Sequence, residues 1–131
     1  MNKDYSLWTP VKKEINNKKP RFTFKVGEVW ITSVGENVGF EEDGKGKSFN
    51  RPVLILKKFN KFLCHVVPLS TTEKRGKYYF EIDTHTNKYS VALLSQNKTI
   101  DSLRLFRKIG FVSKETLFKV RLEIAKNTLE L

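Results

Sequence analysis

The chain contains very few of the residues that bind metals or form disulfides. It has one cysteine, Cys64, and two histidines, His65 and His85, with no CxxC or HExxH pattern. A lone cysteine in the apolar stretch FLCHVVPL is typical of a small core residue. Cys64 and His65 are neighbours in a predicted strand, so their side chains should point to opposite faces and not form a nucleophile pair. We therefore expect no metal site and no cofactor, and we interpret His65 as an ordinary strand residue.

Long apolar segments are also missing. No run approaches the roughly 20 residues that a membrane-spanning helix needs. The N-terminal stretch MNKDYSLWTPVKKEINNKK lacks the apolar region of a signal peptide. These two absences predict a cytoplasmic protein with no membrane partner.

Acidic residues are scarce relative to basic ones. The sequence has 14 Asp and Glu against 25 Lys and Arg, a formal net charge of +11. This excess favours a polyanionic partner, with nucleic acid ahead of a membrane surface, although general solubility is the alternative explanation. With 131 residues, 39% of them hydrophobic, the chain suits one domain with a modest core.

Residues 1–25 differ from the rest and are interpreted as an N-terminal extension. Thr9 and Pro10 are a predicted helix start, with Thr9 as N-cap and Pro10 in the first helical position. Leu7, Val11 and Ile15 then form one narrow apolar stripe. We favour a short helix packed on the core over an RNA-binding arm.

Residues 26–131 show the pattern of a small β domain. Five runs rich in β-branched and aromatic residues predict strands: VGEVWITSV, RPVLILKKF, KFLCHVVPL, KYYFEI and YSVALL. RPVLIL and FLCHVV are continuously apolar and should cross the middle of the sheet, joined in an antiparallel hairpin at Asn60-Lys61. Residues 99–101 are expected to form a turn or helical piece, and RLFRKIGFV a last strand. The whole indicates a small barrel or strongly bent sheet.

A helix is predicted at the C-terminus. Ser113 is a suitable N-cap, and Glu115 lies in the first turn, where the helix dipole favours an anion. One apolar face is expected from Leu117, Val120 and Ile124, widened by Phe118, Leu122, Ala125 and Leu129. Such an amphipathic helix would either cover the barrel or lie at an interface.

The loop of residues 35–50 ends at a charged residue beside the core. Its glycines permit a long connection, and no Gly-Lys-Ser/Thr leads into a helix, so it is not a phosphate-binding P-loop. Long loops without secondary structure are uncommon in compact domains and are often functional. Arg51 follows, with Pro52 at the strand start, and its guanidinium suits phosphate oxygens. A solvated charge is the alternative interpretation of Arg51.

Four segments together resemble the PemK/MazF family of toxins from type II toxin–antitoxin systems. They are GEVWITSVGENVGFEEDGKG, NRPVLIL, VVPLSTTEK and SVALLSQNKTIDSLRL, within residues 26–131. The resemblance implies a mainly β fold: an SH3-like small barrel of antiparallel strands with a C-terminal amphipathic helix, assembled as a homodimer.

The resemblance also implies an activity. The protein would be a sequence-specific, metal-independent endoribonuclease that cuts single-stranded RNA, chiefly mRNA, leaving a 2′,3′-cyclic phosphate and a 5′-OH. A cognate antitoxin would inhibit it, and the complex of the two would bind DNA. Two other functions are considered: a non-enzymatic toxin of the same fold that binds DNA gyrase, and a catalytically silent RNA-binding module.

Four residues are carried over as catalytic candidates. Arg51 matches the arginine of the family's Arg-Pro motif and would stabilise charge on the phosphate. Ser70 falls where many members have a catalytic threonine, with Thr71 as the alternative hydroxyl. Glu41 would be the general base or an acid that orders the loop. Ser95 departs from the acid that several relatives carry at its position, which removes one other candidate base.

Further residues are candidates for RNA binding. Lys98 would contact phosphate or be a solvated strand-end lysine, and bases could stack on the aromatic residues. The basic residues Lys57, Lys58 and Arg75 are expected to flank the same groove. The RNA-binding candidates are Lys45, Lys47, Phe49, Lys74, Lys77, Tyr78, Gln96 and Lys98, with Tyr79 as a further aromatic neighbour.

Overall fold

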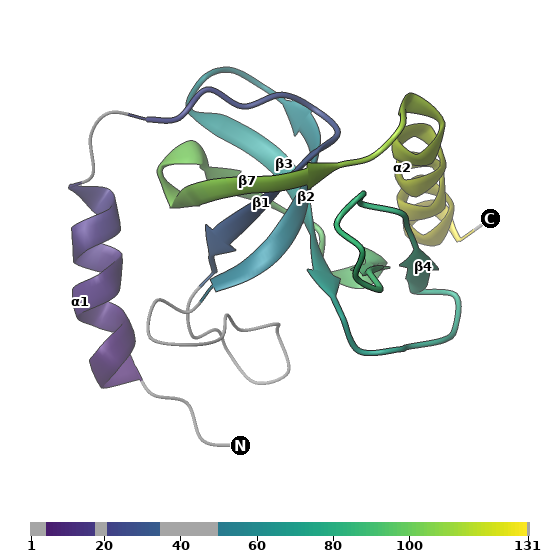
Figure 1. The fold of residues 1–131 in the computed structure, drawn as a ribbon, viewed down its shortest axis with the longest axis horizontal. Helices are drawn as coiled ribbons and strands as arrows, with labels where there is room; N and C mark the ends of the chain where they lie inside the picture. The colour runs from purple at the N-terminus through teal and green to yellow at the C-terminus, as the bar shows by residue number, and fades with distance from the viewer. Residues whose placement is uncertain (1–4, 18–20, 35–49, 131) are drawn as a thin grey trace.

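The computed structural model describes residues 5–17, 21–34 and 50–130 (Figure 1). These residues form a seven-stranded antiparallel sheet and two helices, which confirms the predicted mainly β fold with a helix near each end. The elements, in chain order, are α1 (Tyr5–Asn16), β1 (Glu28–Ser33), β2 (Asn50–Lys58), β3 (Leu63–Ser70), β4 (Tyr79–Glu81), β5 (Val91–Leu93), η1 (Leu94–Gln96), β6 (Lys98–Asp101), η2 (Ser102–Arg104), β7 (Leu105–Phe111) and α2 (Lys114–Leu129). Neither helix in the described ranges is long and apolar enough to cross a membrane.

The hairpin of β2 and β3 is the centre of the sheet, as the two continuous apolar runs predict. The strand order is β4-β5-β3-β2-β1-β7, and β6 also pairs with β3. On the side of β3 away from β2, residues 63–66 pair with β6 and residues 69–70 pair with β5. The Asn60 side chain closes the hairpin turn, because its Oδ1 accepts hydrogen bonds from the Phe62 and Leu63 amides at 2.7 and 3.0 Å.

The two faces of the β2–β3 hairpin carry separate hydrophobic clusters. Side chains alternate between faces along a strand, so neighbours in sequence enter different clusters. The first cluster lies between the sheet and α2, and it comprises Val29, Leu54, Leu56, Val67, Leu69, Ile82, Ala92, Leu94, Val112, Leu117 and Val120. The second cluster, on the other face, comprises Phe24, Trp30, Val34, Val53, Ile55, Cys64, Val66, Ile100 and Leu105.

Helix α2 begins where the sequence predicts, but its buried face is narrower than the predicted apolar face. The Ser113 hydroxyl accepts a hydrogen bond from the Thr116 amide at 3.1 Å, which caps the N-terminus. Leu117 and Val120 are buried in the first cluster, and Ile124 packs against it. The expected widening of this face is wrong: the remaining apolar residues are exposed on another side of the helix, namely Phe118, Leu122, Ala125 and Leu129.

Two predicted boundaries differ in the structure. Helix α1 begins at Tyr5, so Pro10 lies inside it and Thr9 is not its N-cap; the Thr9 hydroxyl instead donates to the Tyr5 carbonyl oxygen at 3.0 Å. The buried residue of α1 is Trp8, whereas Leu7, expected to face the core, is exposed. Residues 99–101 are not a turn or helical piece, because they pair with β3 as part of β6.

Candidate functional site

Arg51 and Ser70 lie together at the open end of the β2–β3 hairpin. Arg51 is near the start of β2 and Ser70 is the last residue of β3, and both are buried. The Arg51 Nη1 donates a hydrogen bond to the carbonyl oxygen of Leu69, 3.1 Å away. The sequence placed these two residues 19 positions apart, and the hairpin brings the arginine side chain to the residue adjacent to Ser70.

The two side chains belong to the same face of the sheet. Arg51 is two positions before Val53 on β2, and Ser70 is four positions after Val66 on β3, so each shares a face with its valine. Both valines lie in the second cluster. Thr32 on β1 pairs with Arg51 and is fully buried on this face. A polar row of Ser70, Arg51 and Thr32 therefore crosses three adjacent strands at the edge of the second cluster.

The hydroxyl of Ser70 is fixed in place by the backbone that follows it. Its Oγ accepts a hydrogen bond from the Thr72 amide at 3.1 Å. This bond uses one acceptor position of the oxygen and leaves its O–H able to donate to another group. Thr71, the alternative hydroxyl, is exposed in the turn after β3.

Four of the predicted site residues lie outside the described part of the chain. They are Glu41, Lys45, Lys47 and Phe49. The proposals for these residues remain predictions from the sequence.

Lys74, Lys77 and Tyr78 lie in the segment that follows Ser70. Lys74 Nζ is 5.8 Å from the centre of the Tyr79 ring, and Lys77 Nζ is 5.0 Å from the centre of the Tyr78 ring. Each lysine therefore makes a cation–π contact with a partly exposed tyrosine. The segment after β3 presents positively charged residues followed by two aromatic rings.

Gln96 and Lys98 lie beside β3, at a greater distance from Ser70. Lys98 is opposite Val66 in the β3–β6 pairing, and Gln96 ends the short η1 turn; both are half-buried. Val66 and Ser70 are four positions apart on β3, which corresponds to about 13 Å along the strand. His65 Nε2 and Asn97 Oδ1 are 2.8 Å apart, which gives His65 a structural hydrogen bond in this region.

Lys57 and Lys58 do not flank the Arg51–Ser70 pair. They lie at the opposite end of β2, and six residues of strand separate Lys57 from Arg51 by about 20 Å. Lys58 Nζ donates to the Phe24 carbonyl oxygen at 3.1 Å and lies 4.6 Å from the Phe24 ring centre. The expectation that these lysines border the groove is therefore wrong.

Arg104 is a cation near this end of the sheet that the sequence reasoning missed. Its Nη1 donates to the carbonyl oxygen of Ser33 at 3.2 Å, at the residue after Thr32. Its guanidinium carbon also lies 5.9 Å from the centre of the Trp8 ring in α1. Burial lowers the pKa of Arg104, and the nearby Asp101 carboxylate counteracts part of that effect. An arginine between two leucines, Leu103 and Leu105, was the available sequence signal.

Asn50 is a second residue that sequence reasoning missed. It precedes Arg51, and its Oδ1 is buried without a hydrogen-bond partner among the residues that the structure describes. A buried acceptor left without a donor costs about 1–3 kcal/mol. This oxygen is therefore a buried polar group directly beside Arg51 whose hydrogen-bonding capacity the described residues leave unused.

Comparison with known families and structures identifies the domain. The family described as PemK-like, MazF-like toxin of type II toxin–antitoxin system matches residues 25–127. A comparison with curated proteins found no match.

Several solved structures share this fold. MazF from Deinococcus radiodurans is 19% identical, with a TM-score of 0.69 over 84% of this chain and 99% of that chain. The Mycobacterium tuberculosis toxin MazF-mt6 is 22% identical, with a TM-score of 0.58 over 79% of this chain and 97% of that one. An endoribonuclease from a mycobacterial species, solved in complex with its cognate antitoxin, is 16% identical, with a TM-score of 0.60 over 83% and 97% of the two chains.

Proposed function

Because this chain belongs to the family of PemK-like, MazF-like toxins of type II toxin–antitoxin systems, we propose that it is a metal-independent endoribonuclease that cuts single-stranded RNA at specific sequences. The observation that carries the proposal is the placement of Arg51 beside Ser70 on one face of the sheet. The positive net charge of the chain, +11, suits a polyanionic substrate.

The proposed reaction is an internal transfer at one phosphodiester. The ribose 2′-oxygen forms a bond to the adjacent phosphorus, and the bond from phosphorus to the 5′-oxygen of the next nucleotide breaks. The 2′-OH loses its proton and the departing 5′-oxygen gains one. The products are a 2′,3′-cyclic phosphate and a 5′-OH, so no water enters this step.

Arg51 is proposed to stabilise the charge that develops on the phosphoryl oxygens. A guanidinium holds several N–H donors in a fixed plane, and its hydrogen bond to the Leu69 carbonyl orients that plane. Fixed donors aimed at developing charge are worth about 10²–10³ in rate each. A guanidinium is a poor proton acceptor, so we do not assign Arg51 the role of base.

Ser70 is proposed to donate its hydroxyl proton to a phosphoryl oxygen. The hydrogen bond from the Thr72 amide holds its oxygen in place and leaves the O–H available. This geometry favours Ser70 over the exposed Thr71. For the general base we propose Glu41, from the family pattern.

The RNA is proposed to continue from Ser70 along the segment that carries Lys74, Lys77 and Tyr78. The lysines would neutralise phosphates, and a ring such as Tyr78 would stack on an unpaired base, worth about 1–3 kcal/mol per base. Gln96 and Lys98 would contact the substrate farther along β3.

Two protein partners belong to the same proposal. A cognate antitoxin is supported by the MazE–MazF complexes of Deinococcus radiodurans and by the mycobacterial complex. A homodimer is supported by the second apolar side of α2, where Phe118 is 64% and Leu129 65% exposed. Sedimentation of the purified protein should give twice the chain mass.

The decisive experiment is cleavage of a long single-stranded RNA in the presence of EDTA. We expect discrete fragments that end in a 2′,3′-cyclic phosphate and begin with a 5′-OH. Arg51→Ala should reduce the rate by at least about 10²-fold. Intact RNA after prolonged incubation with folded protein, or cleavage only after a divalent cation is added, would contradict the proposal.

Arg107→Ala is the matched control. Arg107 is an exposed strand arginine in β7, so its removal deletes the same charge without touching the Arg51–Ser70 pair. Its cleavage rate should stay within about twofold of wild type. RNA binding without cleavage in the wild-type protein would favour the silent RNA-binding module, and gyrase-dependent DNA breaks would favour the gyrase-binding toxin.

A further inference from the structure

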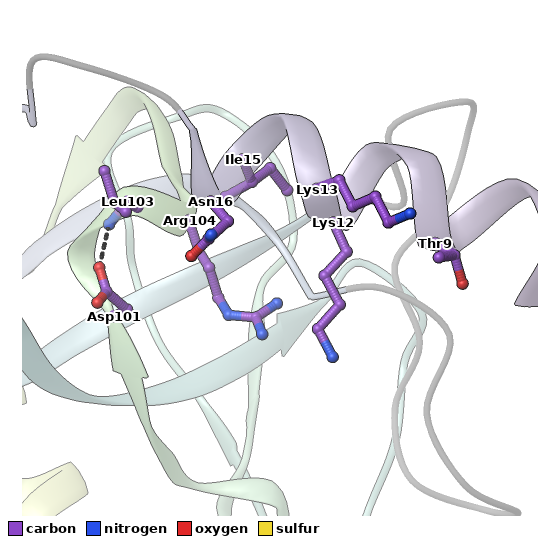
Figure 2. Close-up of a pocket in the computed structure, with 8 residues that line it drawn as sticks. All are labelled: Thr9, Lys12, Lys13, Ile15, Asn16, Asp101, Leu103 and Arg104. Atoms are coloured by element: carbon purple, nitrogen blue, oxygen red, sulfur yellow. Dashed lines mark hydrogen bonds between the residues drawn. The ribbon is translucent and has the colours of Figure 1, made fainter.

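A pocket of about 380 Å³ lies between α1 and the polypeptide around η2 (Figure 2). One wall comes from the N-terminal helix and the other from the end of β6 and the η2 turn. The lining residues are Thr9, Lys12, Lys13, Ile15 and Asn16 of α1, with Asp101, Leu103 and Arg104 opposite. Helix α1 lies outside the segment 25–127 that matches the toxin family, so half of this pocket comes from the extension.

The lining combines apolar side chains with positive charge. Ile15 and Leu103 are half-buried and contribute apolar surface, whereas Lys12 and Lys13 are exposed at the rim. Figure 2 shows the ammonium group of Lys12 and the guanidinium group of Arg104 extending to the same side of α1.

Among the described residues that line the pocket, one carries a carboxylate, Asp101, and this carboxylate is already engaged. It forms an ion pair with Arg21 and accepts a hydrogen bond from the Leu103 amide at 2.8 Å. Burial raises its pKa, but the hydrogen bonds from Arg21 and Leu103 and the charges of Arg21 and Arg104 outweigh that effect, so the pKa lies below its ordinary value. The charge that the pocket offers to a ligand is therefore positive.

The pocket adjoins the polar row that contains Arg51. Leu105, beside Arg104, pairs with Thr32, and Thr32 pairs with Arg51. Adjacent strands lie about 4.8 Å apart, so Ser70 on β3 and Leu105 on β7 are separated by about 14 Å across the sheet. A nucleic acid held at Arg51 would reach the pocket within a few nucleotides.

We propose that this pocket binds one unpaired nucleotide of the RNA substrate, with the base against Ile15 and Leu103 and the phosphate at Lys12 and Lys13. The inference rests on the proposed ribonuclease function and adds a substrate-binding site to it. A small apolar cavity with cations at its rim matches a flat base with its attached phosphate. Helix α1 would thus extend the RNA contact surface beyond the family domain.

The first test measures RNA affinity against salt concentration. The probe is a fluorescent, mixed-sequence RNA of ~20 nucleotides, longer than the roughly 4–16 nucleotides that a small β-barrel binds. It is fully 2′-O-methylated, so it lacks the attacking hydroxyl. Loss of the one phosphate contact in Lys12→Ala/Lys13→Ala should reduce the log–log slope by about 0.7, and the affinity near 0.1 M salt by about 5-fold.

Lys114→Ala/Lys119→Ala is the matched control for charge. It removes two exposed helix lysines from α2, and both its affinity and its slope should equal those of wild type. Far-UV circular dichroism should show that all variants keep their helix content. An unchanged slope in Lys12→Ala/Lys13→Ala would overturn the proposal.

The second test fills the pocket without changing its charge. In Ile15→Trp the larger ring should occupy the base position, which would weaken RNA binding by about 5- to 100-fold, the value of one stacked base. The salt slope should stay at the wild-type value, because no phosphate contact is lost. Wild-type affinity in this variant would overturn the proposal, even if the lysine variant behaved as expected.

Cleavage of unmodified RNA separates this inference from the function on which it rests. If the wild-type protein cleaves RNA and both pocket variants bind the probe normally, the pocket proposal fails and the ribonuclease proposal stands. If the wild-type protein binds RNA but never cleaves it, and the variants bind the probe weakly, the ribonuclease proposal fails and the pocket proposal stands. Variants that lose affinity for an acidic peptide but keep it for RNA would also overturn the proposal.

Discussion

The two helices lie on opposite sides of the strands and contact them in different ways (Figure 1). Helix α2 contributes Leu117 and Val120 to the first cluster and closes that side with apolar contacts. Helix α1 buries one large residue, Trp8, and leaves an open, positively charged pocket beside η2. We infer from this difference that α2 mainly stabilises the domain, whereas the proposed nucleotide site gives α1 a role in binding.

The two faces of the central hairpin also differ, in the residues that border their hydrophobic clusters. The first cluster consists only of hydrophobic residues, from strands on several sides and from α2. The second cluster ends in the polar row of Ser70, Arg51 and Thr32. Buried polar groups lower stability unless they are hydrogen-bonded, and Arg51 meets this requirement through the Leu69 carbonyl oxygen.

The largest effect is expected from Leu117→Ala in α2. Removing this buried side chain leaves a cavity in the first cluster and should lower the free energy of unfolding by about 2–4 kcal/mol, measured by urea titration. Lys119→Ala, an exposed position of the same helix, should change it by less than about 0.5 kcal/mol. Equal effects of the two substitutions would break the comparison.

An intermediate effect is expected from Ser113→Ala. The Ser113 hydroxyl caps α2 through the Thr116 amide, and loss of such a cap costs about 1 kcal/mol. Thr9→Ala in α1 is the matched substitution, because the Thr9 hydroxyl bonds a carbonyl within the helix and caps nothing. Thermal unfolding should shift for Ser113→Ala and stay near wild type for Thr9→Ala.

A smaller effect on stability is expected from removing residues 1–20. The truncated protein keeps both clusters and the Arg21–Asp101 ion pair, so its unfolding free energy should fall by less than that of Leu117→Ala. Its RNA salt slope should nevertheless fall at least as far as in Lys12→Ala/Lys13→Ala. A truncated protein that fails to fold, or that binds RNA as wild type does, would contradict the division of roles between the helices.

The smallest effect at neutral pH is expected at Cys64, which lies in the second cluster. Burial, and then the charge of Asp101, raises the pKa of this thiol to about 11. The unfolded chain releases the thiol proton at lower pH than the folded chain does, so stability should decline as pH rises from the ordinary thiol value toward about 11. Cys64→Val should remove this decline, and native Cys64 should resist alkylation at pH 8.

The sequence predicts the centre of the fold better than its periphery. The apolar runs of β2 and β3 are long enough to identify two central strands, and the cap at Ser113 identifies the start of α2. Residues 99–101 were misassigned because their strand pairing depends on β3, which no local pattern shows. The start of α1 was misplaced because Thr9-Pro10 has the composition of a helix start, while the helix extends one turn farther back, to Tyr5.

The site depended more on family resemblance than on local pattern. Arg51 and Ser70 are ordinary residues at strand ends until the hairpin register puts them on one face. Arg104 escaped prediction because an arginine in a basic chain resembles any solvated cation, and only the fold shows it bonded to Ser33. Lys57 and Lys58 were misplaced because their position on β2 is near Arg51 in sequence but at the opposite strand end.

The turn at Asn60 also has a consequence for the order of folding. A hairpin forms from its turn outward, and the nearest pairs close first because their loops are shortest. Arg51 and Ser70 are at the far end from that turn, so they meet only when the last pairs have formed. A newly made chain would therefore have no assembled Arg51–Ser70 pair until the central hairpin is complete, and under the proposed function partly folded molecules would not cleave the RNA around them.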